Sequence, residues 1–195
     1  MRIAAATNNQ NKIVEIQQIL NSSGLENVEI VNPKSLNIVS DPEENSEILE
    51  GNARIKAVSL FEKTGIPSFA DDTGLFVEEL EGKPGVHSAR FASEDANDAD
   101  NRQLLLQLLK NKTNRNAYFE TVICFITDKE EKYFKGRCVG QINNTERGSN
   151  GFGYDSIFIP EGYNETFAEL NSEIKNKISH RYNAIVGFTD WLKSI

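Results

Sequence analysis

Runs of hydrophobic and polar positions alternate in the N-terminal third of the chain and predict strands and helices in turn. An apolar run at residues 2–6 predicts a strand, and apolar residues recur at helical spacing over residues 12–21. A second short strand is expected at residues 28–31 and a longer amphipathic helix at residues 48–63. The segment PSFADD, residues 67–72, completes the order strand, helix, strand, helix, strand. This order indicates an α/β fold with right-handed connections.

The pattern changes in the second half of the chain. A leucine-rich helix is expected at residues 98–109, and two long strands at residues 116–127 and 131–139, joined by DKEE, predict an antiparallel hairpin. A loop runs into a further strand within residues 151–160, and residues 172–195 are mostly helical in pattern. We therefore expect a mixed twisted sheet flanked by helices. Because no repeat or linker-like composition interrupts the 195 residues, we expect a single domain.

Charge and composition narrow the classes of function. The chain has 21 Lys and Arg against 29 Asp and Glu, and its net charge of −8 disfavours a nucleic-acid binder. A small phosphorylated substrate needs only a few local cations and a metal ion, so it remains possible. No apolar run approaches the roughly 18 residues of a membrane span, and no signal peptide is expected. Cys124 and Cys138 make no disulfide framework, so we expect a reducing, cytoplasmic location and no membrane partner.

Carboxylates gather at two places and are candidates for metal binding. Asp71 and Asp72 follow a predicted strand end, where open α/β sheets bind ligands, and only one of them can point into a given site if the strand stays extended. Glu43, Glu44 and Glu47 precede the second long helix, and any one of them could supply a further oxygen ligand for Mg²⁺. A helix cap and an interaction with the helix dipole explain these residues equally well without a metal.

A polar turn and a glycine-rich loop are the next candidates. The turn TNNQNK, from Thr7 to Lys12, lies between a predicted strand and helix, and a helix cap is its simplest interpretation. The loop GSNGFGYD at residues 148–155 lets the backbone approach a ligand, and its Phe152 and Tyr154 rings could stack on a base. A packed turn explains the same loop without a ligand.

Basic side chains crowd near the end of the chain. Lys175, Lys177, His180 and Arg181 fall within seven residues of an otherwise acidic protein. On one continuous helix, Lys177 would lie one turn from both His180 and Arg181. A solvated basic face is the alternative interpretation. The sequence contains no serine-hydrolase elbow, zinc-ligand spacing or Walker A loop.

Five segments, taken in order, closely resemble those of the Ham1/RdgB-like nucleoside triphosphate pyrophosphatases, also called inosine triphosphate pyrophosphatases. They are TNNQNK, ADDTGL, GKPGVHSARFA, GFGYD and KNKISHR. The resemblance runs from Ile3 to about Ala184. It implies hydrolysis of non-standard purine triphosphates (ITP, dITP and XTP) to the monophosphate and pyrophosphate, which cleanses the nucleotide pool, with a divalent metal, normally Mg²⁺. It also implies two lobes with a central substrate cleft, and a homodimer.

The same resemblance implies roles for individual residues. Asp72 would be the general base, activating a water that attacks the α-phosphorus, and Glu44 and Asp72 would hold the metal. His180 and Arg181 would lie near the 6-keto edge of the base. The full set of substrate-binding residues that the resemblance implies is Thr7, Asn8, Asn9, Gln10, Asn11, Lys12, Lys56, Thr73, Phe152, Gly153, Tyr154, Asp155, Lys175, His180 and Arg181.

Two alternative functions stay open. The related Maf-like pyrophosphatases act on modified pyrimidine nucleotides, although the His180–Arg181 pair and the complete GFGYD loop favour purines. A nucleotide-binding protein without catalysis would keep the binding residues alone. Release of pyrophosphate from ITP with Mg²⁺, absent in EDTA, distinguishes an enzyme from a binding protein.

Overall fold

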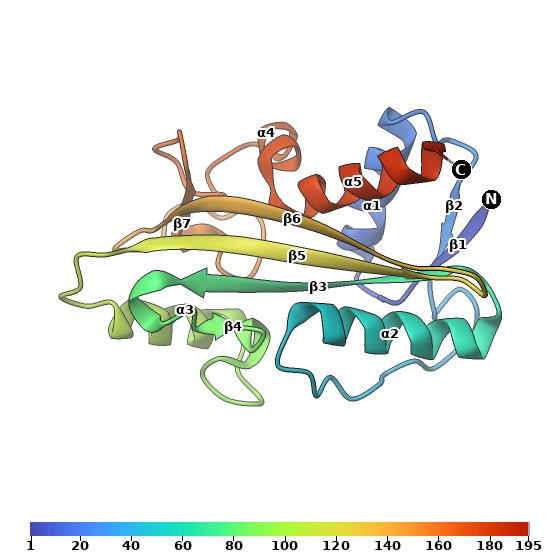
Figure 1. The fold of residues 1–195 in the computed structure, drawn as a ribbon. Coiled ribbons are helices and arrows are strands. Elements are labelled where there is room, and N and C mark those ends of the chain that lie inside the picture. The colour runs from blue at the N-terminus through green and yellow to red at the C-terminus, as the bar shows by residue number, and fades with distance from the viewer. Residues whose placement is uncertain (195) are drawn as a thin grey trace. The chain divides into compact units, whose positions relative to one another are not determined.

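The computed structural model describes residues 1–194, except for the side chain of Asn11, and the chain divides into two compact units. Unit 1 comprises Met1–Asp72, Thr121–Gly136 and Arg181–Ile195, and unit 2 comprises Thr73–Glu120 and Arg137–His180. Three long strands contribute residues to both units: β3 (Ser68–Val77), β5 (Asn116–Ile126) and β6 (Glu131–Ile142). Figure 1 shows the course of the chain. Whether the 195 residues act as one domain stays a prediction.

Unit 1 has the strand and helix order that the hydrophobic pattern predicts. Its strands lie in the order β2-β1-β3-β5-β6. β1 (Arg2–Ala5) pairs in parallel with β2 (Glu29–Val31) and with β3, so that Ala4 lies opposite both Val31 and Ser68. The helices of this unit are α1 (Gln10–Ser22), α2 (Leu49–Thr64) and α5 (His180–Ser194).

Alternate residues of the unit 1 strands face different helices. Ile3 and Phe69 belong to an apolar cluster with Leu20 of α1 and Phe188 of α5. The next residue of β3, Ala70, packs with the alanines of α2 instead. The sheet of this unit is therefore covered by α1 and α5 on one face and by α2 on the other, as Figure 1 shows. Burial on both faces explains why these strands are almost continuously hydrophobic.

Unit 2 contains the antiparallel part of the sheet. Its strands lie in the order β4-β3-β5-β6-β7; β4 (Pro84–Gly85) pairs antiparallel with β3, and β7 (Phe158–Pro160) antiparallel with β6. Its helices are α3 (Asp98–Leu108) and α4 (Ser172–Ile178), with short 3₁₀ turns η1 (Glu78–Leu80), η2 (Ser88–Arg90) and η3 (Asp155–Ile157). Parallel and antiparallel pairs occur together, so the predicted mixed α/β sheet is confirmed.

One expectation from the sequence is wrong, and one condition that it set is not met. β3 does not end at the acidic pair but continues past Asp72 to Val77, because Leu75 and Phe76 pair with β4 and Val77 is buried in the core of unit 2. The C-terminal helix is not continuous, since Ser179 adopts extended backbone angles (φ −67°, ψ 152°). Lys177 therefore lies in the last turn of α4, which ends at Ile178, while His180 begins α5, so the one-turn spacing that a continuous helix would give does not exist.

The break between α4 and α5 coincides with buried packing. Ser179 and His180 are both buried, and the imidazole of His180 stacks on Phe119 of unit 2, with ring centroids 4.6 Å apart.

Among residues 1–194, no helix is both long enough and apolar enough to cross a membrane.

Candidate active site

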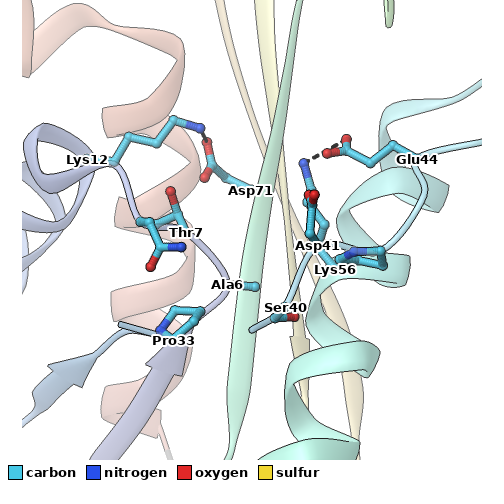
Figure 2. Close-up of a pocket in the computed structure, with 11 residues that line it drawn as sticks. Ala6, Thr7, Lys12, Pro33, Ser40, Asp41, Glu44, Lys56 and Asp71 are labelled. Atoms are coloured by element: carbon cyan, nitrogen blue, oxygen red, sulfur yellow. Dashed lines mark hydrogen bonds and ion pairs between the residues drawn. The ribbon is translucent and has the colours of Figure 1, made fainter. Parts of the chain in front are cut away.

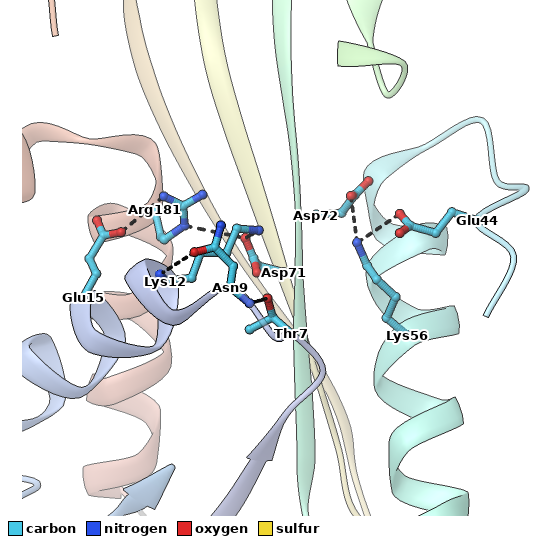
Figure 3. Close-up of polar contacts among 9 residues, drawn as sticks. All are labelled: Thr7, Asn9, Lys12, Glu15, Glu44, Lys56, Asp71, Asp72 and Arg181. Atoms are coloured by element: carbon cyan, nitrogen blue, oxygen red, sulfur yellow. Dashed lines mark hydrogen bonds and ion pairs between the residues drawn. The ribbon is translucent and has the colours of Figure 1, made fainter. Parts of the chain in front are cut away.

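Asp71 and Asp72 lie next to each other within β3 and point to opposite faces of it, as neighbouring residues of an extended strand do. On one face, Asp71 Oδ2 accepts a hydrogen bond from Lys12 Nζ at 2.8 Å and lies 3.6 Å from Arg181 Nε. On the other face, Asp72 Oδ1 accepts from Lys56 Nζ at 3.0 Å. Figure 3 shows these two groups on either side of the strand. The two aspartates therefore contact different cationic side chains: Asp71 contacts Lys12 and Arg181, and Asp72 contacts Lys56.

A polar cavity opens where β1 and β2 end. The segments that follow these two strands line a pocket of about 290 Å³, together with side chains of α2 and β3. Open α/β sheets bind ligands at the carboxyl ends of parallel strands, and this cavity has that position within unit 1. Its lining residues, most of them labelled in Figure 2, are Ala6, Thr7, Asn8, Lys12, Pro33, Ser40, Asp41, Pro42, Glu44, Lys56 and Asp71.

The polar turn before α1 caps that helix. Thr7 Oγ1 accepts a hydrogen bond from the amide of Asn9 at 3.1 Å, and Asn9 Oδ1 accepts from the amide of Lys12 at 3.3 Å. Asn8 Oδ1 accepts from the amide of Lys34 at 3.2 Å and so ties the turn to the loop after β2. Helix α1 begins at Gln10, two residues earlier than predicted. The cap interpretation is confirmed, and phosphate contacts for this turn stay predictions.

Residue Asn11 lies within α1, but its side chain is outside the described part of the structure, so its predicted contact with substrate finds no test here.

Lys56 joins the two carboxylates that the sequence proposes as metal ligands. Its Nζ donates to Glu44 Oε2 and to Asp72 Oδ1, each at 3.0 Å. Glu44 comes from the loop before α2, Lys56 from the middle of α2, and Asp72 from β3, so side chains from three segments of unit 1 meet at one ammonium group. The role of Glu44 as a metal ligand stays a prediction.

Burial and neighbouring charges shift the pKa values of the two aspartates in opposite directions. Burial raises the pKa of Asp72, and the attraction of Lys56 offsets this only in part. Burial also acts to raise the pKa of Asp71, but Lys12 and Arg181 outweigh it and hold the pKa well below its usual range. The pKa of Lys56 is raised because its carboxylate neighbours outweigh its burial. Asp71 therefore keeps its negative charge to lower pH than an ordinary aspartate, whereas Asp72 accepts a proton more readily.

Glu44 and Asp72 suit a divalent cation. The Oδ2 atom of Asp72 is buried and accepts no hydrogen bond from the described residues, so a carboxylate oxygen is left for a further ligand. Both carboxylates approach the same ammonium nitrogen and therefore lie within reach of one positive charge. Among residues 1–194, no group of three or more His, Cys, Asp or Glu side chains gathers as a metal cage. Two carboxylates completed by water and phosphate oxygens are a usual way for proteins to hold Mg²⁺.

The glycine-rich loop of unit 2 exposes one aromatic ring and buries the other. Phe152 is 45% exposed, whereas Tyr154 lies in the unit 2 core and donates a hydrogen bond from its hydroxyl to the carbonyl of Ser88 at 2.8 Å. Of the two rings expected to stack on a base, only Phe152 is therefore accessible. Tyr154 anchors the loop instead.

Asp155 connects this loop to α4. Its Oδ2 accepts from the amide of Phe152 at 2.9 Å and from Lys175 Nζ at 2.6 Å, and that ammonium lies 5.4 Å from the centre of the Phe152 ring. Lys175 is thus held beside the exposed ring. His180 also belongs to unit 2 and is buried there against Phe119, and Thr73 follows Asp72 along β3.

Reasoning from the sequence missed several residues that the fold brings to these groups. Glu15 Oε2 lies 3.3 Å from Arg181 Nη1. The sequence also predicted no partner for Asp71, which lies 3.6 Å from Arg181 Nε. Glu15 lies three residues after Lys12 on α1, which is a helical spacing, but nothing in the sequence connects it with Arg181. Asp98 and Arg102 of α3 contact Gly153. Their four-residue spacing predicts that they share one face of a helix, but it does not predict which segment that face contacts.

Comparison with known proteins identifies the family. The model of the Ham1 family matches residues 3–191. The chain belongs to the Ham1 family. A dITP/XTP pyrophosphatase from Flavobacterium johnsoniae is 45% identical over 192 residues, with 98% of each chain covered.

Two solved structures of Ham1-type proteins agree with this fold. The Ham1 protein of Staphylococcus aureus is 36% identical with a TM-score of 0.90, and the comparison covers 100% of this chain and 99% of that one. A nucleoside-triphosphatase, or dITP/XTP pyrophosphatase, from Mycobacterium abscessus is 38% identical with a TM-score of 0.80, covering 98% of this chain and 100% of that one. The resemblance inferred from five short segments and the α/β mixed-sheet fold class are therefore both confirmed.

Proposed function

We propose that this member of the Ham1 family hydrolyses dITP, ITP and XTP to the monophosphate and pyrophosphate with Mg²⁺ and so removes non-standard purines from the nucleotide pool. Relatives named dITP/XTP pyrophosphatases, similar over nearly their whole length, support the substrate class. The observation that carries the proposal is the orphaned Oδ2 of Asp72, next to Lys56 and Glu44 in unit 1, because this carboxylate oxygen is not occupied by a hydrogen bond from the protein.

The candidate active-site residues of unit 1 have different roles in this reaction. Asp72 orients a water molecule and takes its proton as the water oxygen attacks the α-phosphorus; the bond from that phosphorus to the bridging oxygen breaks, and pyrophosphate leaves. Lys12 and Lys56 donate to phosphate oxygens and offset their charge. A divalent cation held by Glu44 and Asp72 would neutralise further phosphate charge.

The turn before α1 holds the phosphates in this proposal. The amides at the start of α1 and the side chains of Thr7, Asn8, Asn9 and Gln10 supply neutral donors there, with Asn11 assigned by resemblance alone. Their cap hydrogen bonds hold the turn in one conformation before substrate arrives. The binding energy is then not spent on ordering the turn.

The nucleoside contacts are assigned from the resemblance and from the surroundings of each residue within its own unit. Phe152 stacks on the base, and Gly153, Tyr154 and Asp155 form the loop that carries it. Lys175 and Thr73 contact the substrate as the resemblance implies.

The 6-keto group of the purine is the expected basis of selectivity. His180 and Arg181 donate to this keto group, whereas adenine presents an amino donor at the same position. A buried donor left without an acceptor costs about 1–3 kcal/mol, which corresponds to roughly ten- to hundredfold discrimination against adenine.

A panel of nucleoside triphosphates assayed for pyrophosphate release tests this function. We expect release from dITP, ITP and XTP with Mg²⁺, none in EDTA, and at least tenfold lower kcat/KM for ATP. Modified pyrimidine triphosphates belong in the same panel, because preference for them would replace the proposal by a Maf-like activity. Binding of ITP without any release would indicate a nucleotide-binding protein instead.

Variants of Asp72 test its catalytic role. Asp72→Asn removes the proton acceptor, so kcat should fall at least about a hundredfold while KM changes less. Glu29→Gln, which alters an exposed pair with Arg2 in the same unit, is the control and should keep wild-type activity. An Asp72→Asn protein with near wild-type kcat at saturating Mg²⁺ would remove Asp72 from this role.

Two broader expectations belong to the same proposal. The family resemblance implies a homodimer, which sedimentation equilibrium would test, and action in the cytoplasm, which cell fractionation would test.

A further inference from the structure

Two charged residues of α3 hold the backbone of a single residue of the glycine-rich loop. Asp98 Oδ2 accepts a hydrogen bond from the amide of Gly153 at 2.7 Å, and Arg102 Nη1 donates to the carbonyl of the same glycine at 2.8 Å. Asp98 and Arg102 are four residues apart and therefore lie on one face of α3. Both backbone groups of Gly153 are thus bound by charged partners, which form stronger hydrogen bonds than neutral ones.

Arg102 also fastens the segments on either side of this glycine. Its Nε donates to Glu146 Oε2 at 2.8 Å, and Ser156 Oγ donates to the same carboxylate oxygen at 2.9 Å. The Arg102 side chain is only 17% exposed, so these contacts are partly shielded from water. The cavity beside them, of about 140 Å³, is lined by Arg102, Glu146 and the loop residues 148–153, 155 and 156.

Helix α3 offers a fixed platform for these contacts. Asn97 and Asp100 form a complete capping box at its N-terminus, and Leu105 is fully buried in the unit 2 core. Asn101, between the two loop-binding residues, is buried and binds the backbone of Ala89 and Ala92. Asp98 and Arg102 are therefore presented from a well-anchored element.

The loop itself needs an external constraint. Gly153 has φ +60° and no side chain, and a Cβ placed there would meet no heavy atom within 4 Å, so no other segment packs against this residue on the side where a side chain would project. The residue before it, Phe152, is exposed, and its amide is bound to Asp155. Two sets of hydrogen bonds thus hold the backbone beside the exposed ring. One joins the amide of Phe152 to Asp155, and the other joins Gly153 to Asp98 and Arg102 of α3.

We infer that Asp98 and Arg102 are positioning residues that set the backbone on both sides of Gly153, and with it Phe152, in the orientation that receives the purine base. This inference rests on the proposed function of the loop as the nucleoside contact. A purely structural role for the pair predicts lower stability with unchanged recognition. A positioning role predicts weaker nucleoside binding with unchanged chemistry, because only a fraction of the molecules then has the competent loop.

The test compares Asp98→Ala and Arg102→Gln with wild type. We expect KM for dITP to rise about five- to tenfold, with kcat within twofold, as a five- to tenfold smaller competent fraction requires. Asp98→Asn keeps an acceptor oxygen and should restore most of the affinity. Lys112→Gln, which breaks a surface pair with Glu79 in the same unit, is the matched control and should change neither constant.

Hydrogen–deuterium exchange supplies a readout that does not need activity. The amide of Gly153 should exchange faster in Asp98→Ala than in wild type, with Asp98→Asn intermediate, while the amides of β5 stay protected. An unchanged KM in a protein whose Gly153 amide exchanges faster would overturn the inference, and so would an unchanged exchange rate. A wild-type protein that releases no pyrophosphate from any triphosphate would instead overturn the proposed function, and the exchange rates would still decide whether Asp98 holds the loop.

Discussion

Asp71 balances two cations in the interior of unit 1, and its replacement by asparagine tests that arrangement. Its side chain is 4% exposed, that of Arg181 6%, and that of Lys12 21%. Asp71→Asn keeps the volume but removes the charge. Loss of one partner from a buried ion pair costs about 3–5 kcal/mol. We expect the lower end, about 3 kcal/mol of unfolding free energy, because Lys12 is partly hydrated and Arg181 keeps its contact with Glu15.

The effect should depend on pH in a defined direction. Because the pKa of Asp71 is lowered in the folded protein, its charge stabilises the fold above the unfolded pKa of about 4, and this contribution is lost as the pH falls below that value. The difference in stability between wild type and Asp71→Asn should therefore be largest near pH 7 and should narrow towards pH 3.

Trp191 makes the measurement specific to unit 1. It is the single tryptophan of the chain and packs there on Phe125, Phe134 and Phe188. Urea unfolding in EDTA, followed by its fluorescence, should show the loss, and Tm should fall by about 6–12 °C. Glu29→Gln, at an exposed pair, should stay within about 0.5 kcal/mol. A loss below about 0.5 kcal/mol for Asp71→Asn, or a loss that is constant from pH 7 to pH 3, would refute the reasoning.

Three further predictions concern buried groups. Burial raises the pKa of both free thiols, Cys124 and Cys138, to about 11, so iodoacetamide at pH 8 should label neither in the native protein and both after denaturation, as mass spectrometry would show; rapid native labelling would contradict this. Tyr154→Phe loses its hydrogen bond to Ser88 and should destabilise unit 2 by about 1–2 kcal/mol, measured by urea unfolding with circular dichroism. Asn101→Ala frees the Ala89 carbonyl and the Ala92 amide and should cost about 2 kcal/mol in the same assay, whereas exposed Lys112→Gln should cost almost nothing.

The local hydrophobic pattern was sufficient to predict most of the strands and helices. It predicted β1, α2, α3 and the long strands β5 and β6 within a few residues, because the periods of two and 3.6 residues reflect which side of each element is buried. The turn between β5 and β6 closes with a hydrogen bond from the amide of Thr127 to the carbonyl of Glu130 at 2.9 Å, as expected for a hairpin. Five short motifs in their order were sufficient to identify the family.

Where elements end was less predictable, because pairing and packing with distant segments decide it. β3 continues past two charged residues, where it pairs with β4 and lies beside β5 in the sheet, and two adjacent carboxylates give no local signal of that continuation. The helix at the C-terminus breaks at Ser179, where Ser179 and His180 become buried, although the local residues are compatible with a continuous helix. In both cases tertiary contacts outweigh local propensity.

The sequence by itself determined the family, the order of the elements and the types of side chain available for phosphate, metal and base. Only the tertiary structure decided which of those side chains meet. Lys12 contacts Asp71 across 59 residues, Arg181 contacts Glu15 across 166, and Gly153 contacts Asp98 across 55. Such contacts depend on how strands pair and which faces of helices are buried, and a single sequence records only local periodicity. The free oxygen of Asp72 and the charged contacts of Gly153 could therefore be found only in the folded chain.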